Sequence, residues 1–214
     1  MRLVDLTLPI PATLAGRQIV RREPLEIRSG GTCYTGMLYQ FSHGSMAGTY
    51  LDLPGHIKET DDGMDAENCP VEALYRLAAT VLHLDRQSGS GAVHAAELAA
   101  AGPAPAAGGA LIVNALGAKR FDEIEERTVW LALDAVRWIV STGVRLLVSD
   151  VYESTPVLTG VFPELFAAHI ATVCYPVNLH RLAAPRVRLT ALAPRFQTAT
   201  QLPCRVVAEL PDDT

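Results

Sequence analysis

The sequence predicts an α/β domain in which strands and helices form packed layers. Short apolar runs of the length of buried strands alternate with amphipathic helical segments through the middle of the chain. The last third is richer in strand patterns. With 214 residues, of which 49% are hydrophobic, the chain can bury a sizeable core, so we expect a single domain over residues 1–214.

Extended segments are predicted in the first quarter of the chain. Residues 3–10 (LVDLTLPI) alternate apolar and polar side chains like an edge strand, and prolines end the pattern. A second extended segment is predicted over residues 35–41. Because glycines and prolines interrupt residues 43–56, this segment is predicted to be a strand that leads into a loop. Loops carry binding and catalytic residues more often than regular elements do.

Helical and strand patterns then alternate to the end of the chain. Predicted helices cover residues 67–77, 94–101, 128–141 and 163–169, and predicted strands cover residues 79–85, 110–113, 144–148, 171–175, 187–192 and 204–210. The Gly/Pro/Ala stretch at residues 102–109 is predicted to be a surface linker. It is too short and too central to indicate a second domain.

Charge and composition exclude several classes of partner. The formal net charge is -5 and the chain has no run of Lys or Arg, so neither nucleic acid nor a membrane surface is expected to bind. We also expect no signal peptide and no membrane span, and hence a cytoplasmic protein. The four cysteines are far apart, which favours reduced structural thiols over a zinc knuckle or a disulfide framework.

The most informative segment is residues 46–56, MAGTYLDLPGH. A Gly-Thr turn precedes Asp52 and His56, which Pro54 holds close together. The segment resembles the signature HxGTHxDxPxH of the kynurenine formamidase and cyclase family of metal-dependent hydrolases. The resemblance continues in five further segments: DLTLPI near the N-terminus, residues 61–73, residues 143–154, residues 177–179 (VNL) and residues 202–210 (LPCRVVAEL).

Membership of this family would imply the swivelling β/β/α fold and a homo-oligomer, a dimer or tetramer, with the active site near a subunit interface. It would also imply a set of ligand positions for a metal ion. The two ligand histidines of the signature fall on Met46 and Tyr50, the ligand aspartate on Asp52, and the catalytic histidine on His56. Counting from VNL, the ligand glutamate falls on Cys174 and the last ligand histidine near Phe162.

Most of these side chains cannot serve a hydrolytic metal ion. Such a site needs His nitrogens or carboxylate oxygens, whereas Met is a poor ligand for hard ions, neutral Tyr is weak and Phe has no donor atom. We therefore expect neither a metal nor another cofactor. The alternative is a zinc site rearranged around His43, Asp52, His56 and Cys174.

The remaining polar groups suggest acid–base chemistry on a small molecule. His56 could act as a general base with Asp52 as its partner, and the Tyr50 hydroxyl could stabilise a developing oxyanion. This set suits proton abstraction next to a carbonyl, followed by ring closure, dehydration or isomerisation. The lead hypothesis is therefore a cyclase acting on a small carbonyl-rich metabolite, such as a polyketide-like intermediate in natural product biosynthesis.

Further side chains are candidates for contact with the substrate. They are His43, Met46, Asp150, Tyr152, Phe162 and Cys174. Structural roles stay open for some of them: Asp150 could brace its loop, and Cys174 could be an inert residue of a buried strand. Two other functions also stay open, namely a metal-dependent hydrolase of an amide, formamide or lactone, and a non-catalytic relative that binds a small ligand.

Overall fold

A large curled sheet forms the body of the protein, for which a computed structural model describes residues 2–155 and 158–211. The strand order in this sheet is β1 (Arg2–Asp5), β15 (Arg205–Leu210), β13 (Arg186–Leu192), β7 (Leu77–His83), β9 (Ala110–Asn114), β11 (Leu146–Ser149), β12 (Ala171–Cys174), β6 (Tyr50–Asp52) and β14 (Gln201–Pro203). The four central strands β7, β9, β11 and β12 are parallel, and the flanking pairs are antiparallel.

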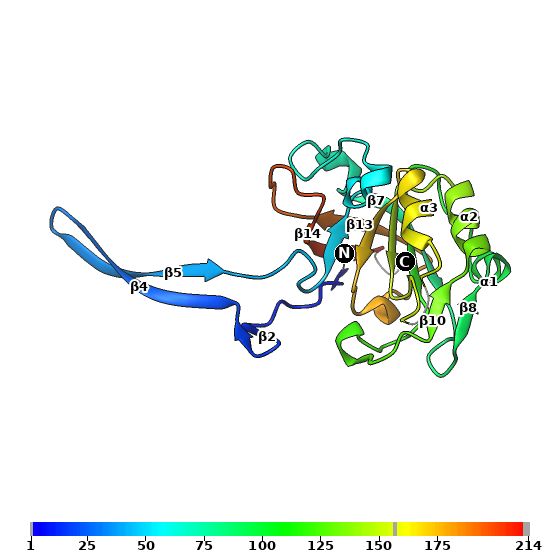
Figure 1. The fold of residues 1–214 in the computed structure, drawn as a ribbon, viewed down its shortest axis with the longest axis horizontal. Coiled ribbons are helices and arrows are strands. Elements are labelled where there is room, and N and C mark those ends of the chain that lie inside the picture. The colour runs from blue at the N-terminus through cyan, green and yellow to red at the C-terminus, as the bar shows by residue number, and fades with distance from the viewer. Residues whose placement is uncertain (1, 156–157, 212–214) are drawn as a thin grey trace.

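Three short helices pack on one face of the parallel strands (Figure 1): α1 (Ala95–Ala100), α2 (Leu133–Ser141) and α3 (Val161–Ala167). On this face, Leu111 and Leu147 are buried with helix residues such as Ile139. On the other face, Ile112 and Val148 belong to a second core enclosed by the curl of the sheet. Strands buried on both faces need continuous apolar runs, which is what the sequence contains. The predicted α/β class is confirmed.

Two predicted helices are wrong in whole or in part. The helical structure within residues 67–77 is limited to a 3-10 turn, Val71–Ala73, because Pro70 is extended and Arg76 has a left-handed φ of 49°. Leu77 already belongs to β7. The N-terminal part of residues 128–141 forms β10 (Val129–Leu131), which pairs in parallel with β8 (Gly91–Val93). Pairing with β8 satisfies its backbone groups, so the helix begins only at Leu133.

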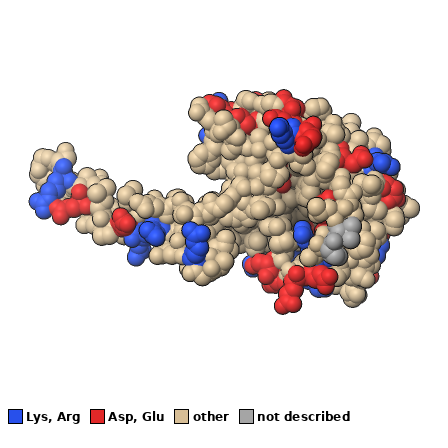
Figure 2. Space-filling view, viewed as in Figure 1, with Lys and Arg blue, Asp and Glu red and all other residues tan. Residues whose placement is uncertain are grey.

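The N-terminal region forms a two-stranded arm that projects from the body (Figures 1 and 2). It consists of β4 (Val20–Ser29) and β5 (Thr32–Phe41), and a small hairpin of β2 (Thr13–Leu14) and β3 (Arg17–Gln18) precedes it. The sequence predicted only the β5 half of this arm. No helix in the described part of the chain is long and apolar enough to cross a membrane.

Candidate functional site

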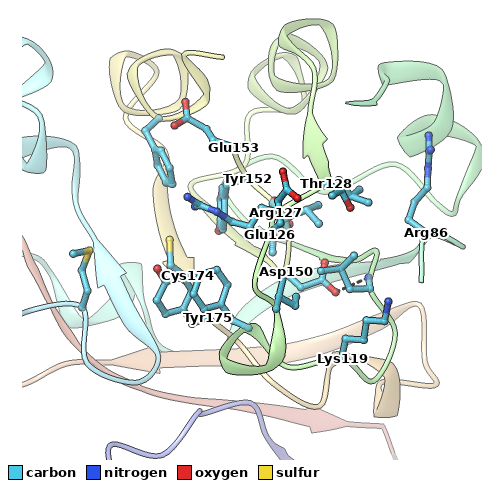
Figure 3. Close-up of a pocket in the computed structure, with 18 of the residues that line it drawn as sticks. Arg86, Lys119, Glu126, Arg127, Thr128, Asp150, Tyr152, Glu153, Cys174 and Tyr175 are labelled. Atoms are coloured by element: carbon cyan, nitrogen blue, oxygen red, sulfur yellow. Dashed lines mark hydrogen bonds between the residues drawn. The ribbon is translucent and has the colours of Figure 1, made fainter. Parts of the chain in front are cut away.

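A cavity of about 430 Å³ opens beside the carboxyl ends of β11 and β12 (Figure 3). Its walls come from the 46–56 segment, the loop before β10, the residues after β11 and the start of α3. The lining side chains considered below are Met46, Tyr50, Asp52, His56, Arg86, Lys119, Phe121, Glu126, Arg127, Asp150, Tyr152, Glu153, Phe162, Cys174, Tyr175 and Gln201. Ligand sites of α/β sheets commonly lie at this end of the strands.

The Gly-Thr turn fixes the position of β6 against its neighbours. Gly48 has a φ of +66°, and a Cβ atom there would lie 2.6 Å from the carbonyl oxygen of Leu8. The buried hydroxyl of Thr49 accepts a hydrogen bond from the Leu8 amide and donates one to the Tyr175 carbonyl, each at 2.7 Å. The turn therefore ties the N-terminal strand segment, β6 and the end of β12 together.

Strand pairing brings Asp52 and Cys174 to one point in the cavity wall. On β6, Tyr50 and Asp52 point to the same face because they are two residues apart, and Tyr50 pairs with Cys174 on β12. The Cys174 thiol lies 3.8 Å from Oδ2 of Asp52, while Oδ1 is buried with no hydrogen-bond partner among the described residues. Burial raises the pKa of Asp52 to about 6, although Gln201, His56 and Cys174 oppose this shift.

His56 reaches Asp52 through a third residue, Gln201. His56 ends the 3-10 turn Pro54–His56, and Nε2 of its ring lies 3.1 Å from Nε2 of Gln201. The same amide accepts a hydrogen bond from Ser45 and lowers the pKa of Asp52. The described contacts include no direct hydrogen bond between Asp52 and His56, so the pairing expected from the sequence is indirect. The reason is that β6 places the Asp52 carboxylate in the buried wall of the cavity, whereas the turn Pro54–His56 places the His56 ring at the exposed rim.

Tyr50 and Tyr175 form a pair of phenols at the cavity wall. Their rings meet edge-on with centroids 5.0 Å apart, and Phe121 stacks on Tyr175 at 3.5 Å. Burial raises the pKa of both tyrosines, and hydrogen bonding from Tyr50 together with the charge of Arg127 opposes the shift at Tyr175. Because their pKa values are raised, both hydroxyls are neutral at neutral pH and can donate hydrogen bonds. The backbone of Tyr175 has a φ of 57°, a conformation that residues with side chains of this size rarely adopt.

The polar atoms of Asp150, Tyr152 and Glu153 form hydrogen bonds with backbone groups of the protein. Asp150 accepts hydrogen bonds from the amides of Ala115 and Leu116, and burial raises its pKa to about 6 against these bonds. The Tyr152 hydroxyl donates to the Val173 carbonyl at 2.8 Å, and Glu153 accepts from the first amides of α3. Asp150 therefore braces its loop, and Tyr152 offers the cavity only its ring, which stacks on Phe162.

The other predicted positions divide between the cavity and its surroundings. Met46 lines the rim with 58% of its surface exposed, and Phe162 lines the wall. His43 is exposed, its Nδ1 lies 2.9 Å from the Gly44 carbonyl oxygen, and it does not belong to the cavity lining. The rearranged zinc site that included His43 is therefore not assembled.

The residues at the family's ligand positions do not fit a metal ion. Across residues 2–155 and 158–211, no three His, Cys, Asp or Glu side chains come together as a set able to hold one. Burial raises the pKa of the Cys174 thiol well above its usual value, which disfavours the thiolate that a metal would bind. Met46 and Phe162 add no hard donor, and the neutral phenol of Tyr50 is only a weak one.

Several residues of the cavity were not predicted from the sequence. Gln201, Tyr175, Phe121, Arg127 and Lys119 come from segments without a motif. Tyr175 directly follows Cys174, and this adjacency to a ligand position was the available signal. Gln201 reaches the site only because β14 pairs with β6, which no local pattern indicates.

Comparisons with known proteins agree with this fold. A family described as "Putative cyclase" matches residues 4–154. A predicted metal-dependent hydrolase from Bacillus stearothermophilus is 16% identical, with 97% of each chain covered and a TM-score of 0.66. Isatin hydrolase A from Ralstonia solanacearum is 17% identical, with 97% of this chain and 91% of that chain covered and a TM-score of 0.69.

A further solved structure, described as a novel cyclase, is 14% identical, with 98% of this chain and 88% of that chain covered and a TM-score of 0.72. No curated protein matches the sequence. At these identities the structural likeness establishes the fold alone.

Proposed function

Because the chain belongs to the Cyclase family, we propose that it is an enzyme that carries out general acid–base chemistry on a small carbonyl compound without a resident metal ion. The observation that supports this most directly is the composition of the cavity wall. Side chains unsuited to a metal occupy all of the family's ligand positions except that of Asp52, while an imidazole and two neutral phenols line the same cavity.

In this proposal His56 removes a proton from the carbon next to a carbonyl group. The C–H electron pair moves to form an enolate, and a hydrogen bond from Tyr175, supported by Tyr50, stabilises the charge on its oxygen. Attack of the enolate carbon on a second carbonyl then closes a ring, and water leaves when the product becomes conjugated. His56 first returns this proton to the new alkoxide. In the dehydration it removes the second proton from the same carbon and gives it to the departing hydroxide, which leaves as water, so no oxidant or reductant is required.

The orientation of the Gln201 amide sets which ring nitrogen of His56 is free to accept the proton from the substrate. With its nitrogen facing the ring, Gln201 donates to Nε2, and Nδ1 then carries the proton. A half-turn of the amide presents its oxygen to Nε2–H and makes Nδ1 the basic nitrogen. Nδ1 has no partner among the described residues. Ionised Asp52 stabilises the imidazolium from behind Gln201.

Proton abstraction can be measured without knowledge of the natural substrate. In deuterated buffer, the protein should catalyse exchange of the methyl protons of an aryl ketone such as acetophenone, followed by NMR. We expect His56→Ala to lower this rate by about 10²-fold or more, and treatment with a chelator to leave it unchanged. His94→Ala is the control, because His94 pairs with Asp134 outside the cavity lining.

Exchange by His56→Ala at the wild-type rate would refute the proposal. A divalent ion that survives dialysis, together with loss of activity on chelation, would favour the hydrolase alternative instead. Ligand-induced stabilisation without any turnover would favour a non-catalytic binding protein.

The proposal includes a homo-oligomer, in which the β4–β5 arm packs on a second copy of the chain. Two-stranded hairpins are at best marginally stable alone in water, so an arm of ten residues per strand needs a packing partner. Large apolar side chains lie exposed on both of its faces. This observation favours an arm held between surfaces of another copy, since apolar patches of this kind mark interaction sites.

A further inference from the structure

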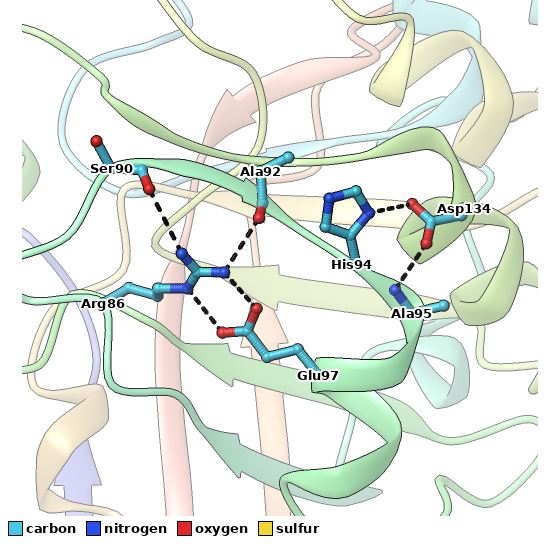
Figure 4. Close-up of polar contacts among 7 residues, drawn as sticks. All are labelled: Arg86, Ser90, Ala92, His94, Ala95, Glu97 and Asp134. Atoms are coloured by element: carbon cyan, nitrogen blue, oxygen red, sulfur yellow. Dashed lines mark hydrogen bonds and ion pairs between the residues drawn. The ribbon is translucent and has the colours of Figure 1, made fainter.

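Three cations line the cavity, and two of them already have partners in the described structure. Arg86 forms a two-point ion pair with Glu97 and also donates to the carbonyls of Ser90 and Ala92 (Figure 4). Lys119 donates to the carbonyl of Gln87. Glu97 therefore neutralises Arg86, whereas Lys119 is exposed to solvent and keeps two of its three donor hydrogens.

Arg127 is the third cation, and it differs from Arg86 in having no carboxylate partner among the described residues and from Lys119 in being partly buried. No carboxylate of the described residues lies within ion-pair distance of its guanidinium, and it points into the cavity toward Tyr175 (Figure 3). Its backbone is fixed, because its amide donates to the Thr155 hydroxyl at 2.8 Å and its carbonyl accepts from the Thr155 amide. The side chain is half-buried, so its charge is partly shielded from water.

The acids of the cavity do not neutralise Arg127. Asp150 and Glu153 are bonded to main-chain amides, and Asp52 lies beside His56 and Gln201. Glu126 is exposed and forms no ion pair with its neighbour. A partly buried guanidinium without an anion is a site for one, because its planar fork matches the two oxygens of a carboxylate.

The surface next to Arg127 is aromatic. Its guanidinium carbon lies 6.0 Å from the centroid of the Phe121 ring, which stacks on Tyr175, and Tyr50 meets Tyr175 edge-on. Such walls favour a planar conjugated ligand, which can stack while its charged end meets the cation. The volume of about 430 Å³ lies within the range of pockets for small molecules, roughly 300–1,000 Å³.

We infer that Arg127 binds the carboxylate of an aromatic or conjugated acid, so that the substrate of this site is a carbonyl compound that also carries a carboxylate. This inference deepens the proposed function and uses the same cavity. The aromatic body would lie along Phe121 and Tyr175, which places its carbonyl beside the two phenols.

Binding of a matched pair of probes tests this assignment. We expect the protein to bind 2-naphthoate at least about tenfold more tightly than the neutral 2-naphthamide at pH 7, measured by calorimetric titration. Arg127→Gln should weaken binding of the naphthoate about tenfold and leave the naphthamide unchanged, while Arg127→Lys should retain part of the preference. Arg120→Gln is the control, because Arg120 is paired with Asp122 and does not belong to the cavity lining.

Equal binding of the two probes by the wild-type protein, no binding of naphthoate, or a preference that survives in Arg127→Gln would each overturn the inference. A loss of the same size in Arg120→Gln would also overturn it, because it would indicate a general effect of surface charge. The test is separate from that of the proposed function, since His56→Ala should lose proton exchange and keep its preference for naphthoate. The two experiments therefore distinguish failure of proton abstraction by His56 from failure of carboxylate binding by Arg127.

Discussion

At the scale of single residues, Asp52 is a buried carboxylate whose hydrogen bonding is incomplete among the described residues. Its side chain is 2% exposed, and one of its oxygens has no hydrogen-bond partner in the described structure. Burial of a carboxylate without full hydrogen bonding disfavours the ionised form, which explains why its pKa rises to about 6. A group in this state lowers stability and is retained in active sites for its charge.

Asp52→Asn should therefore stabilise the protein, and the gain should depend on pH. Below about pH 4 the carboxyl is protonated in both the folded and unfolded states, so the variant gains little. Between pH 4 and 6 the unfolded chain releases the proton first, and the wild type loses stability up to a plateau above pH 6. A shift from 3.8 to about 6 corresponds to roughly 3 kcal/mol at most. Thermal melts of both proteins from pH 4 to 7 measure this difference.

Asp134→Asn serves as the control for this pH series. Hydrogen bonding from the Ala95 amide and from His94 lowers the pKa of Asp134, so its contribution has the opposite sign. The wild type should therefore keep a constant advantage over that variant from about pH 4 to 7 and lose it only as the pH falls below about 4. A difference between wild type and Asp52→Asn that stays constant from pH 4 to 7 would show that Asp52 is not shifted as described.

The sequence predicted which residues lie together at the cavity better than it predicted how their side chains interact. Met46, Tyr50, Asp52, Phe162 and Cys174 line one cavity with His56, while their roles in catalysis and binding stay predictions. The role of Gln201 could not be foreseen, because it depends on the pairing of strands that are about 150 positions apart in the chain. Side-chain contacts of this kind follow from tertiary structure and leave no local pattern.

At the scale of elements, the buried strands were predictable and the marginal helices were not. The strands β9, β11 and β12 are buried on both faces, and the continuous apolar runs that such strands need are visible in the sequence. Residues 67–77 have helical spacing, but the Asp65 carboxylate caps a local turn by accepting from the amides of Glu67 and Asn68. Local capping and an extended Pro70 outweigh a weak helical periodicity there.

Thr49 connects three elements through one hydroxyl, and its removal should be costly. Thr49→Val keeps the shape of the side chain but leaves the Leu8 amide and the Tyr175 carbonyl without this partner. We expect a loss of about 2–4 kcal/mol in the free energy of unfolding, measured by urea denaturation. Proton exchange should also slow, because the hydrogen bond to the carbonyl helps to hold Tyr175 at its φ of 57°.

Thr13→Val is the matched control, because Thr13 is exposed on β2. Its free energy of unfolding should stay within about 0.5 kcal/mol of the wild type. If Thr49→Val unfolds at the same urea concentration as this control, the hydroxyl does not join the elements as proposed.

At the scale of the whole molecule, the arm contrasts with the body. The body buries its apolar side chains in two cores on the two faces of one sheet. The arm exposes Leu25 and Leu38 on one face and Met37, Tyr39 and Phe41 on the other. The sequence predicted β5 but neither its partner strand nor their projection, because a hairpin without a core partner has no burial pattern to reveal.

Two acidic substitutions on one face of the arm should dissociate the proposed oligomer. Leu25→Glu combined with Leu38→Glu removes two apolar contacts, each of which contributes about 2 kcal/mol when buried, and adds charges that the interface would have to desolvate. We expect the wild type to sediment at a multiple of 23.0 kDa, and the double variant to sediment at 23.0 kDa over the same concentrations. Ser29→Glu with Thr32→Glu adds the same charge at the tip of the arm and should leave the mass unchanged. A wild-type protein of 23.0 kDa at every concentration, or a Leu25/Leu38 variant that keeps the wild-type mass, would contradict the proposed packing, because the exposed apolar faces would then need no second copy to cover them.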